Sequence, residues 1–176
     1  AGRCPAVGQN VVMIQCVGSR NNQLAYCSRI CCSMAINNAL RIKAKAPDSN
    51  VFVLYRDVRT YGFREKYYQE ARRNGVIFIR YSEQTPPVVS EENGLLVTID
   101  SPDFPEAIEI EADKVVLSTG IHASEDNIKM ADMLKVPLNA DGFFLEAHMK
   151  LRPLYFPTYG FFLAGLTHAP KTMAES

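Results

Sequence analysis

The chain has 176 residues, of which 47% are hydrophobic and 22% charged. It can therefore bury the core of one compact domain or slightly more, and it is not a disordered tail. Nineteen basic residues balance nineteen acidic ones, and this zero net charge gives no electrostatic surface for nucleic acid. The lack of a run of about 18 apolar residues excludes a membrane-spanning helix from this sequence.

The first half of the chain alternates apolar runs with helical periodicity. Short continuous apolar runs predict three buried strands, over residues 11–14, 51–55 and 76–81. Helical spacing predicts two helices between them, over residues 28–46 and 63–74. Ser28 is the predicted N-cap of the first helix, and Gly75 the residue that ends the second. This order predicts an α/β fold, with a Rossmann-like parallel sheet, flanking helices and right-handed crossovers.

The residue pattern of the sequence changes after Pro86-Pro87. Alternating residues predict a β-hairpin or meander insert, with strands over 96–100 and 107–111. The remaining predicted elements are a strand over 114–118, a helix over 126–134 and a last apolar strand over 161–165. We expect three parts: a tail over 1–9, a Rossmann-like domain over 10–120 and a returning segment over 121–176. Both ends look cut, as in a piece of a longer protein.

Four of the five cysteines lie within 17 positions: Cys16, Cys27, Cys31 and Cys32. An odd, clustered set is unlike a secreted disulfide framework and suits a reducing compartment such as the cytoplasm. Four thiolates can supply one ligand to each iron of a [4Fe–4S] cluster. Adjacent Cys31 and Cys32 fit the tetrahedron of a single zinc ion less well. Zinc, a disulfide and small apolar core residues are the alternatives.

The position of the cysteines supports a bound anion. Cys16 follows the first predicted strand, and the other three open the first helix. In a nucleotide-binding fold the pyrophosphate lies at this point, where backbone N–H groups favour an anion, and a cluster held by four thiolates is one. The usual G-x-G-x-x-G is absent, because the loop after Cys16 contains one glycine, Gly18. Cys4 lies outside this spacing and is read as a spare thiol.

These residues resemble a known family. The segments 14–20 and 26–32, which carry the cysteines, are similar to the HdrA family of heterodisulfide reductases. The similarity extends over nearly all of the chain, through the segments 55–62, 142–144, 164–165 and 169–171. It implies an oxidoreductase with a FAD core like that of thioredoxin reductase and ferredoxin-type inserts. Such a protein transfers electrons, in some cases by flavin-based bifurcation. Its implied partners are other heterodisulfide reductase-type subunits and carriers such as ferredoxin.

The resemblance also implies site residues. Cys16, Cys27, Cys31 and Cys32 would bind a [4Fe–4S] cluster beside the flavin, and no residue is predicted to be catalytic. The closing stretch resembles a FAD-contacting segment in which a strand ending in Ala-Gly leads into a helix. The FAD-contacting positions there would be Gly165, Thr167 and Lys171. Leu166 stands where flavin disulfide reductases usually have Asp. The first FAD fingerprint is absent, so FAD binding needs a missing N-terminal part, and the isolated chain should be inactive.

Two other functions and several residues stay open at this point. The chain could be the nicotinamide-binding domain of a flavoprotein dehydrogenase, or a non-catalytic module with structural cysteines. Asp57 and Thr60, which follow the second strand, either contact the flavin or a partner, or cap the next helix, and we expect a cap. The three histidines share no metal-ligand spacing and are not expected to be catalytic: His122, His148 and His168.

Overall fold

The computed structural model describes residues 8–92, 94–172 and 175. It contains two compact units. The first comprises residues 1–18 and 31–119, and the second comprises residues 19–30 and 120–176. The segment 19–30 therefore groups with the C-terminal part of the chain, although it lies between the first strand and the first helix. None of the described helices is long and apolar enough to cross a membrane.

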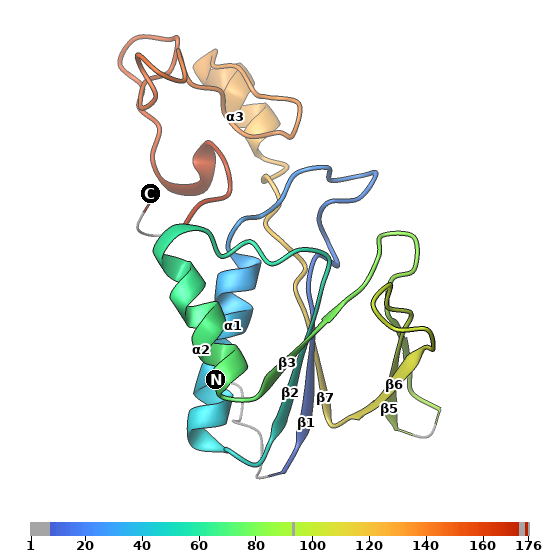
Figure 1. Cartoon of the computed structure of the whole chain (residues 1–176). Coiled ribbons are helices and arrows are strands. Elements are labelled where there is room, and N and C mark those ends of the chain that lie inside the picture. Colours follow the sequence, from blue (N-terminus) through green and yellow to red (C-terminus); the bar gives the residue numbers. More distant parts are fainter. Residues whose placement is uncertain (1–7, 93, 173–174, 176) are drawn as a thin grey trace. The chain divides into compact units, whose positions relative to one another are not determined.

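The first unit is built on a parallel sheet (Figure 1). Its strands are β1 (Asn10–Ile14), β2 (Asn50–Tyr55), β3 (Val76–Arg80) and β7 (Lys114–Leu117). They lie in the order β3-β2-β1-β7, and each neighbouring pair is parallel. β1 is thus an inner strand, with β2 and β7 as partners. All four strands match apolar runs in the sequence, and the predicted Rossmann-like parallel sheet is confirmed.

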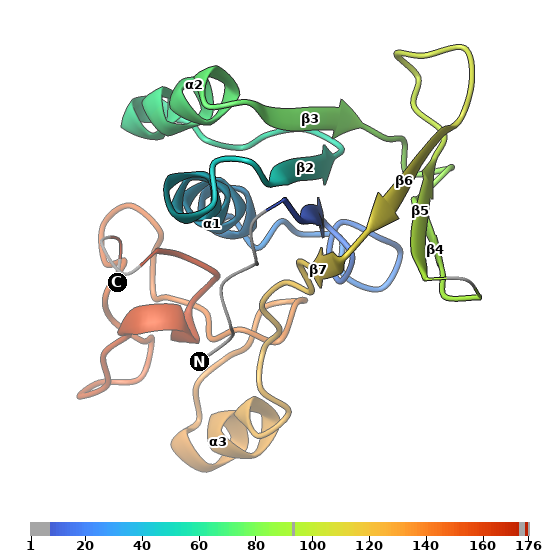
Figure 2. The same cartoon turned by 90° about the horizontal axis from the view of Figure 1, so that it is seen from below.

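Two layers flank this sheet, helices on one side and strands on the other (Figure 2). β1 contributes side chains to the cores on both faces of the sheet, because successive side chains of a strand point to opposite sides. Val11 and Met13 belong to the core under the helices, whereas Val12 and Ile14 belong to the core under the second sheet. Burial on both faces explains why β1 is a continuous apolar run rather than an alternating one.

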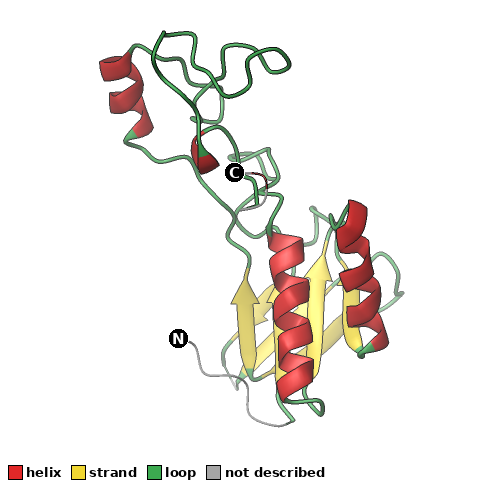
Figure 3. Cartoon of the chain, turned by 90° about the vertical axis from the view of Figure 1, so that its left-hand side faces the viewer, coloured by secondary structure: helices red, strands yellow, loops and turns green. Residues whose placement is uncertain are grey.

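The helical layer consists of α1 (Cys31–Lys45), the 3-10 turn η1 (Gly62–Arg64) and α2 (Glu65–Arg73), and the two α-helices lie in front of the strands in Figure 3. α1 packs through Ala35, Ile36 and Ala39, all at most 6% exposed. α2 ends as predicted, at a glycine with a φ of 74°, whose N–H donates to the Arg72 carbonyl over 3.1 Å. Glycine suits this left-handed position because it has no Cβ.

The opposite layer is a small antiparallel sheet of β4 (Val88–Ser90), β5 (Leu95–Ile99) and β6 (Ile108–Ala112). The predicted hairpin corresponds to β5 and β6. β4 was not predicted, since its three residues are all exposed and carry no alternating pattern. Val97, Ile99 and Ile110 cover the parallel sheet. Each such buried side chain contributes about 1.5–3 kcal/mol.

The second unit has little regular structure besides α3 (Asn127–Leu134) and the 3-10 turn η2 (Gly165–Thr167). Its core is a cluster of Val136, Phe144, Phe156 and Leu163. The predicted strand over 161–165 is wrong. Within the described residues they form one isolated bridge, Tyr155 to Phe162, and no strand ladder. The apolar run instead serves the local core, through Leu163.

Candidate metal centre

Cys16 is the second residue after β1, at the carboxyl edge of the parallel sheet. Its backbone φ is 62°, a left-handed conformation that a residue with a Cβ adopts only at a cost. The next two residues are fixed to the end of β7, since the Val17 N–H donates to the Ser118 carbonyl over 3.1 Å. Gly18 lies so close that a Cβ there would be 1.9 Å from the Thr119 carbonyl oxygen. The loop therefore places Cys16 by backbone packing.

Cys31 and Cys32 are the first two residues of α1. Consecutive helical residues point about 100° apart, so the two side chains leave the helix in different directions. Cys32 is buried, with its sulfur 3.9 Å from the Asp57 carbonyl oxygen, whereas Cys31 is half-buried. Both lie in the first turn of a helix, where unpaired N–H groups and the helix dipole favour negative charge. The start of α1 thus suits thiolates.

Ser28 does not cap α1, and that prediction is wrong. The helix begins three residues later, at Cys31, because Arg29 takes a left-handed φ of 63°. The Ser28 hydroxyl instead accepts a hydrogen bond from the Ile121 N–H over 2.8 Å. Tyr26 makes a second link to the same residue, donating from its hydroxyl to the Ile121 carbonyl over 2.8 Å. The segment that carries Cys27 is thereby tied into the second unit.

Cys27 has a donor directed at its sulfur. The Arg29 backbone N–H lies 3.3 Å from the Cys27 sulfur and donates to it. Hydrogen bonds of this kind stabilise thiolate sulfur and help to set the potential of iron–sulfur clusters. The Tyr26 ring packs edge-on against Phe143, with 5.6 Å between centroids. Burial, followed by the Asp141 charge, raises the pKa of the Tyr26 hydroxyl, which therefore stays protonated as a donor.

Left-handed residues other than glycine gather in this loop. Among the described residues four have this conformation, and three of them lie in the cysteine segment: Cys16, Arg20 and Arg29, with φ of 60–63°. Each costs about 1–2 kcal/mol, and such residues persist only where the surrounding structure holds them. They cluster characteristically at ligand-binding and active sites. The conformation of this loop therefore costs stability and is typical of a ligand-binding site.

The chemistry of the donor set fits an iron–sulfur cluster, since the segment offers four thiols. Cys16, Cys31 and Cys32 belong to the first unit and Cys27 to the second. Within the described part of the chain, no three His, Cys, Asp or Glu side chains are gathered closely enough to hold a metal ion. The assignment of these four cysteines as ligands therefore stays a prediction.

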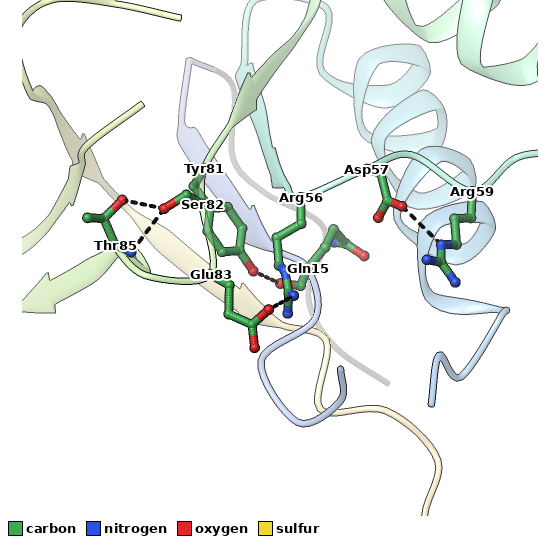
Figure 4. A network of polar contacts seen from close by, with 8 residues as sticks. All are labelled: Gln15, Arg56, Asp57, Arg59, Tyr81, Ser82, Glu83 and Thr85. Carbon is green, nitrogen blue, oxygen red and sulfur yellow. Dashed lines mark hydrogen bonds and ion pairs between the residues drawn. The ribbon is translucent and has the colours of Figure 1, made fainter. Parts of the chain in front are cut away.

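Polar side chains line the carboxyl ends of β1, β2 and β3 in the first unit (Figure 4). Gln15 is 1% exposed, and its carbonyl accepts a hydrogen bond from the Tyr81 hydroxyl. Arg56, just after β2, forms an ion pair with Glu83, just after β3. Sequence reasoning missed Gln15 and Tyr81. The available signal was a glutamine directly after a buried apolar run.

The residues after β2 do not cap a helix, contrary to expectation. Neither η1 nor α2 has a side-chain cap, and their N-cap positions are Tyr61 and Arg64. Asp57 forms an ion pair with Arg59 over 3.2 Å, as Figure 4 shows. The buried Thr60 hydroxyl donates to the Glu65 carboxylate over 3.5 Å. Their alternative role, in contacting a flavin or a partner, stays a prediction.

The predicted flavin segment lies in the second unit. Gly165 has a φ of 61°, and among the described residues no atom other than those of its chain neighbours lies within 4 Å of where its Cβ would be. The Thr167 hydroxyl donates to the Ala164 carbonyl, and its own carbonyl accepts from the Phe144 N–H over 3.0 Å. Thr167 could therefore offer a ligand only an acceptor from its side chain. Lys171 is half-buried. The helix predicted after Ala-Gly is a three-residue 3-10 turn, η2, and residues 173, 174 and 176 lie outside the described structure.

Two of the three histidines have polar partners in the second unit. His168 lies 2.6 Å from the Glu146 carboxylate, measured from Nε2 to Oε2. The Glu146 backbone N–H, and then the His168 ring, hold the pKa of this carboxyl below its usual range, although burial acts to raise it. The His148 Nδ1 accepts hydrogen bonds from the Lys150 and Leu151 N–H groups, both over 3.2 Å.

Comparisons with known proteins found similar sequences over nearly the whole chain. No protein-family model matches the chain. The chain is 42% identical over 170 residues to the CoB–CoM heterodisulfide reductase iron-sulfur protein HdrA of Methanocaldococcus jannaschii, covering 94% of the chain and 26% of that protein. It is 37% identical over 179 residues to the HdrA protein of the H2/formate:CoB-CoM heterodisulfide,ferredoxin reductase of Methanococcus maripaludis, covering 99% of the chain and 27% of that protein.

Among solved structures, the thioredoxin reductase of T. acidophilum has a similar fold. The TM-score is 0.53 at 18% sequence identity, over 94% of this chain and 46% of that one. This likeness confirms the thioredoxin-reductase-like fold class. The chain spans about a quarter of the length of the curated relatives it matches. We conclude that, over nearly its whole length, the chain is homologous to a segment of the HdrA proteins of heterodisulfide reductases.

Proposed function

We propose that the chain is an electron-transfer segment of a flavin and iron–sulfur oxidoreductase of the HdrA type. In this proposal Cys16, Cys27, Cys31 and Cys32 bind one [4Fe–4S] cluster. The cluster would exchange electrons one at a time with FAD. The names of two relatives support this, because one is an iron-sulfur protein and the other belongs to a heterodisulfide,ferredoxin reductase.

The observation that carries the proposal is the coincidence of four thiols with three left-handed residues in one short segment. Cysteines used as small core residues would not require a costly backbone around them. Of the four, only Cys32 is buried; the other three are half-buried. Half-buried thiols at the end of a rigid strand and in the first turn of a helix are placed to bind a ligand.

In this proposal the chain positions the cluster and adjusts its charge balance. β1 fixes Cys16, and the first turn of α1 fixes Cys31 and Cys32. The Arg29 N–H that donates to Cys27 stabilises negative charge on that sulfur. The Gly165, Thr167 and Lys171 segment would contact FAD, and the open space beside Gly165 supports that part of the proposal. Stable FAD binding would need the first glycine fingerprint, which this sequence lacks.

The proposed partners follow from the same relatives. Other heterodisulfide reductase-type subunits and carriers such as ferredoxin would exchange electrons with the complete protein, as the name of the Methanococcus maripaludis relative suggests. We place this reaction in the cytoplasm, because clustered thiols require a reducing compartment to stay available as ligands.

Anaerobic reconstitution tests the cluster assignment. The chain is incubated with ferrous iron and sulfide under strictly anaerobic conditions, desalted, and analysed for iron, sulfide and visible absorption. We expect a brown protein with about four irons per chain, as cubane ligation requires. A colourless protein with one bound zinc would contradict the assignment.

Single serine substitutions then identify the ligands. Each of C16S, C27S, C31S and C32S should lower the iron content or change the spectrum of the cluster. C4S is the matched control, because Cys4 lies outside the ligand spacing, and it should keep the full iron content. Equal loss of iron in C4S, or no loss in the other four, would refute the ligand set.

A further inference from the structure

We propose that the Gln15 side-chain amide donates a hydrogen bond to a sulfur atom of the cluster bound at Cys16, and so raises the reduction potential of that cluster. This inference rests on the proposed function, because it requires a cluster at Cys16. It assigns a role to a residue outside the cysteine set, and it can fail while the cluster assignment holds.

Gln15 carries a buried donor without an acceptor. The residue is 1% exposed. Its Oε1 accepts a hydrogen bond from the Ser118 hydroxyl over 3.0 Å. Its Nε2 is buried and has no hydrogen-bond partner within the described structure. Most buried amide nitrogens have a partner, so an isolated one indicates a missing acceptor.

The amide cannot turn toward solvent to satisfy this donor. The Gln15 N–H donates to the Leu54 carbonyl over 2.9 Å, and the Gln15 carbonyl accepts from the Tyr81 hydroxyl. Ser118, which holds the Oε1, is itself fixed to β1 by its N–H, which donates to the Ile14 carbonyl over 2.9 Å. The backbone and the Oε1 of Gln15 are thus both held by hydrogen bonds, which keep the amide in its buried position.

Sulfur bound at Cys16 is the acceptor that the position favours. Cys16 is covalently next to Gln15, and its left-handed φ ends the strict alternation of β1, so the two side chains are not forced to opposite faces. A cluster held by four thiolates is anionic, and it becomes more negative when reduced. An N–H group directed at its sulfur stabilises the reduced form more than the oxidised form, and this raises the potential.

The substitution Q15M tests this, because methionine keeps a similar length and volume but has no donor. Wild type and Q15M are reconstituted as above and titrated with a reductant under anaerobic conditions, with the reduced cluster followed by electron paramagnetic resonance. We expect the equilibrium constant for reduction to fall about tenfold, which is about 59 mV for a one-electron couple. Q15N retracts the amide by one methylene and should give a smaller shift in the same direction.

Q69M is the matched control, because Gln69 is exposed on α2, and its equilibrium constant should equal that of wild type. An unchanged constant in Q15M with a full cluster would overturn the inference and leave the cluster assignment intact. Failure of both Gln15 variants to load a cluster would also overturn it, since a donor that only adjusts the potential is not needed for assembly. Wild type that takes up no cluster would instead refute the proposed function.

Discussion

The close approach of Gly18 to the end of β7 makes G18A a sharp test of how Cys16 is positioned. A Cβ at this residue would lie 1.9 Å from the Thr119 carbonyl oxygen, whereas real Cβ atoms essentially never come closer than 3.0 Å to such a neighbour. The obstacle is backbone rather than a flexible side chain, so the loop must move. That movement also stretches the hydrogen bond from the Val17 N–H to the Ser118 carbonyl.

The cost follows from these two effects. Overpacking against a fixed backbone costs about 1–3 kcal/mol, and the lost hydrogen bond about 1 kcal/mol, so the free energy of unfolding should fall by about 2–4 kcal/mol. For a chain of this size this lowers the Tm by about 5–15 °C. Thermal unfolding followed by circular dichroism measures the shift. The same variant should bind less iron after reconstitution, because Cys16 moves with the loop.

V17A is the control for G18A. Val17 is adjacent in the same loop, and its side chain is 43% exposed, so its truncation should change the Tm little. A Tm for G18A within about 1 °C of wild type would refute the packing argument, since even the lowest cost above corresponds to several degrees.

Two further predictions concern stability. The pKa of the Glu146 carboxyl in the folded protein lies below its ordinary value of 4.5. Its ionised form therefore stabilises the fold above pH 4.5, and this stabilisation is lost as the pH falls through the folded pKa. The free energy of unfolding of E146Q should therefore fall less between pH 7 and pH 3 than that of wild type. Urea unfolding between pH 7 and pH 3 measures this, and parallel curves for wild type and E146Q would contradict it. Y81F should lower the free energy of unfolding by about 1–3 kcal/mol, because the buried Gln15 carbonyl loses the Tyr81 donor; an unchanged urea midpoint would show that this contact is not stabilising.

The elements that could be predicted from sequence are those whose pattern reflects burial in a layer. β1 and β2 are the inner strands of the parallel sheet, and their continuous apolar runs have the length and composition that such strands require. β3 lies at the edge of the sheet and is only partly buried, but its apolar run is also continuous. The end of α2 was also predictable, because a glycine at this position satisfies a purely local backbone requirement.

The failed predictions depend on partners far away in the sequence. Ser28 has the residue type of an N-cap, but its hydroxyl binds the Ile121 N–H, 93 positions away. The apolar run 161–165 has strand-like composition, but a strand forms only where a neighbour continues the ladder, and here the structure provides one bridge. A single sequence carries no record of such partners.

The candidate site divides in the same way. Cysteine spacing identified the segment, since ligand type and number are local properties. The buried donor of Gln15 depends on Ser118, Leu54 and Tyr81, which lie in or directly after other strands, and only the fold brings these together. A residue that would change the properties of a bound cluster is therefore harder to predict from sequence than a residue that would bind the cluster itself.

β1 is an inner strand of the sheet, and this position determines how fast its amide protons exchange with solvent. Amide protons on an inner strand with both faces covered exchange with solvent only when the whole unit opens. The Gln15 N–H, which directly follows β1 and precedes Cys16, donates to the Leu54 carbonyl of β2. Deuterium should therefore enter this amide and those of β1 late, at a rate set by global opening. The strand that leads into Cys16 is held in place over the same time.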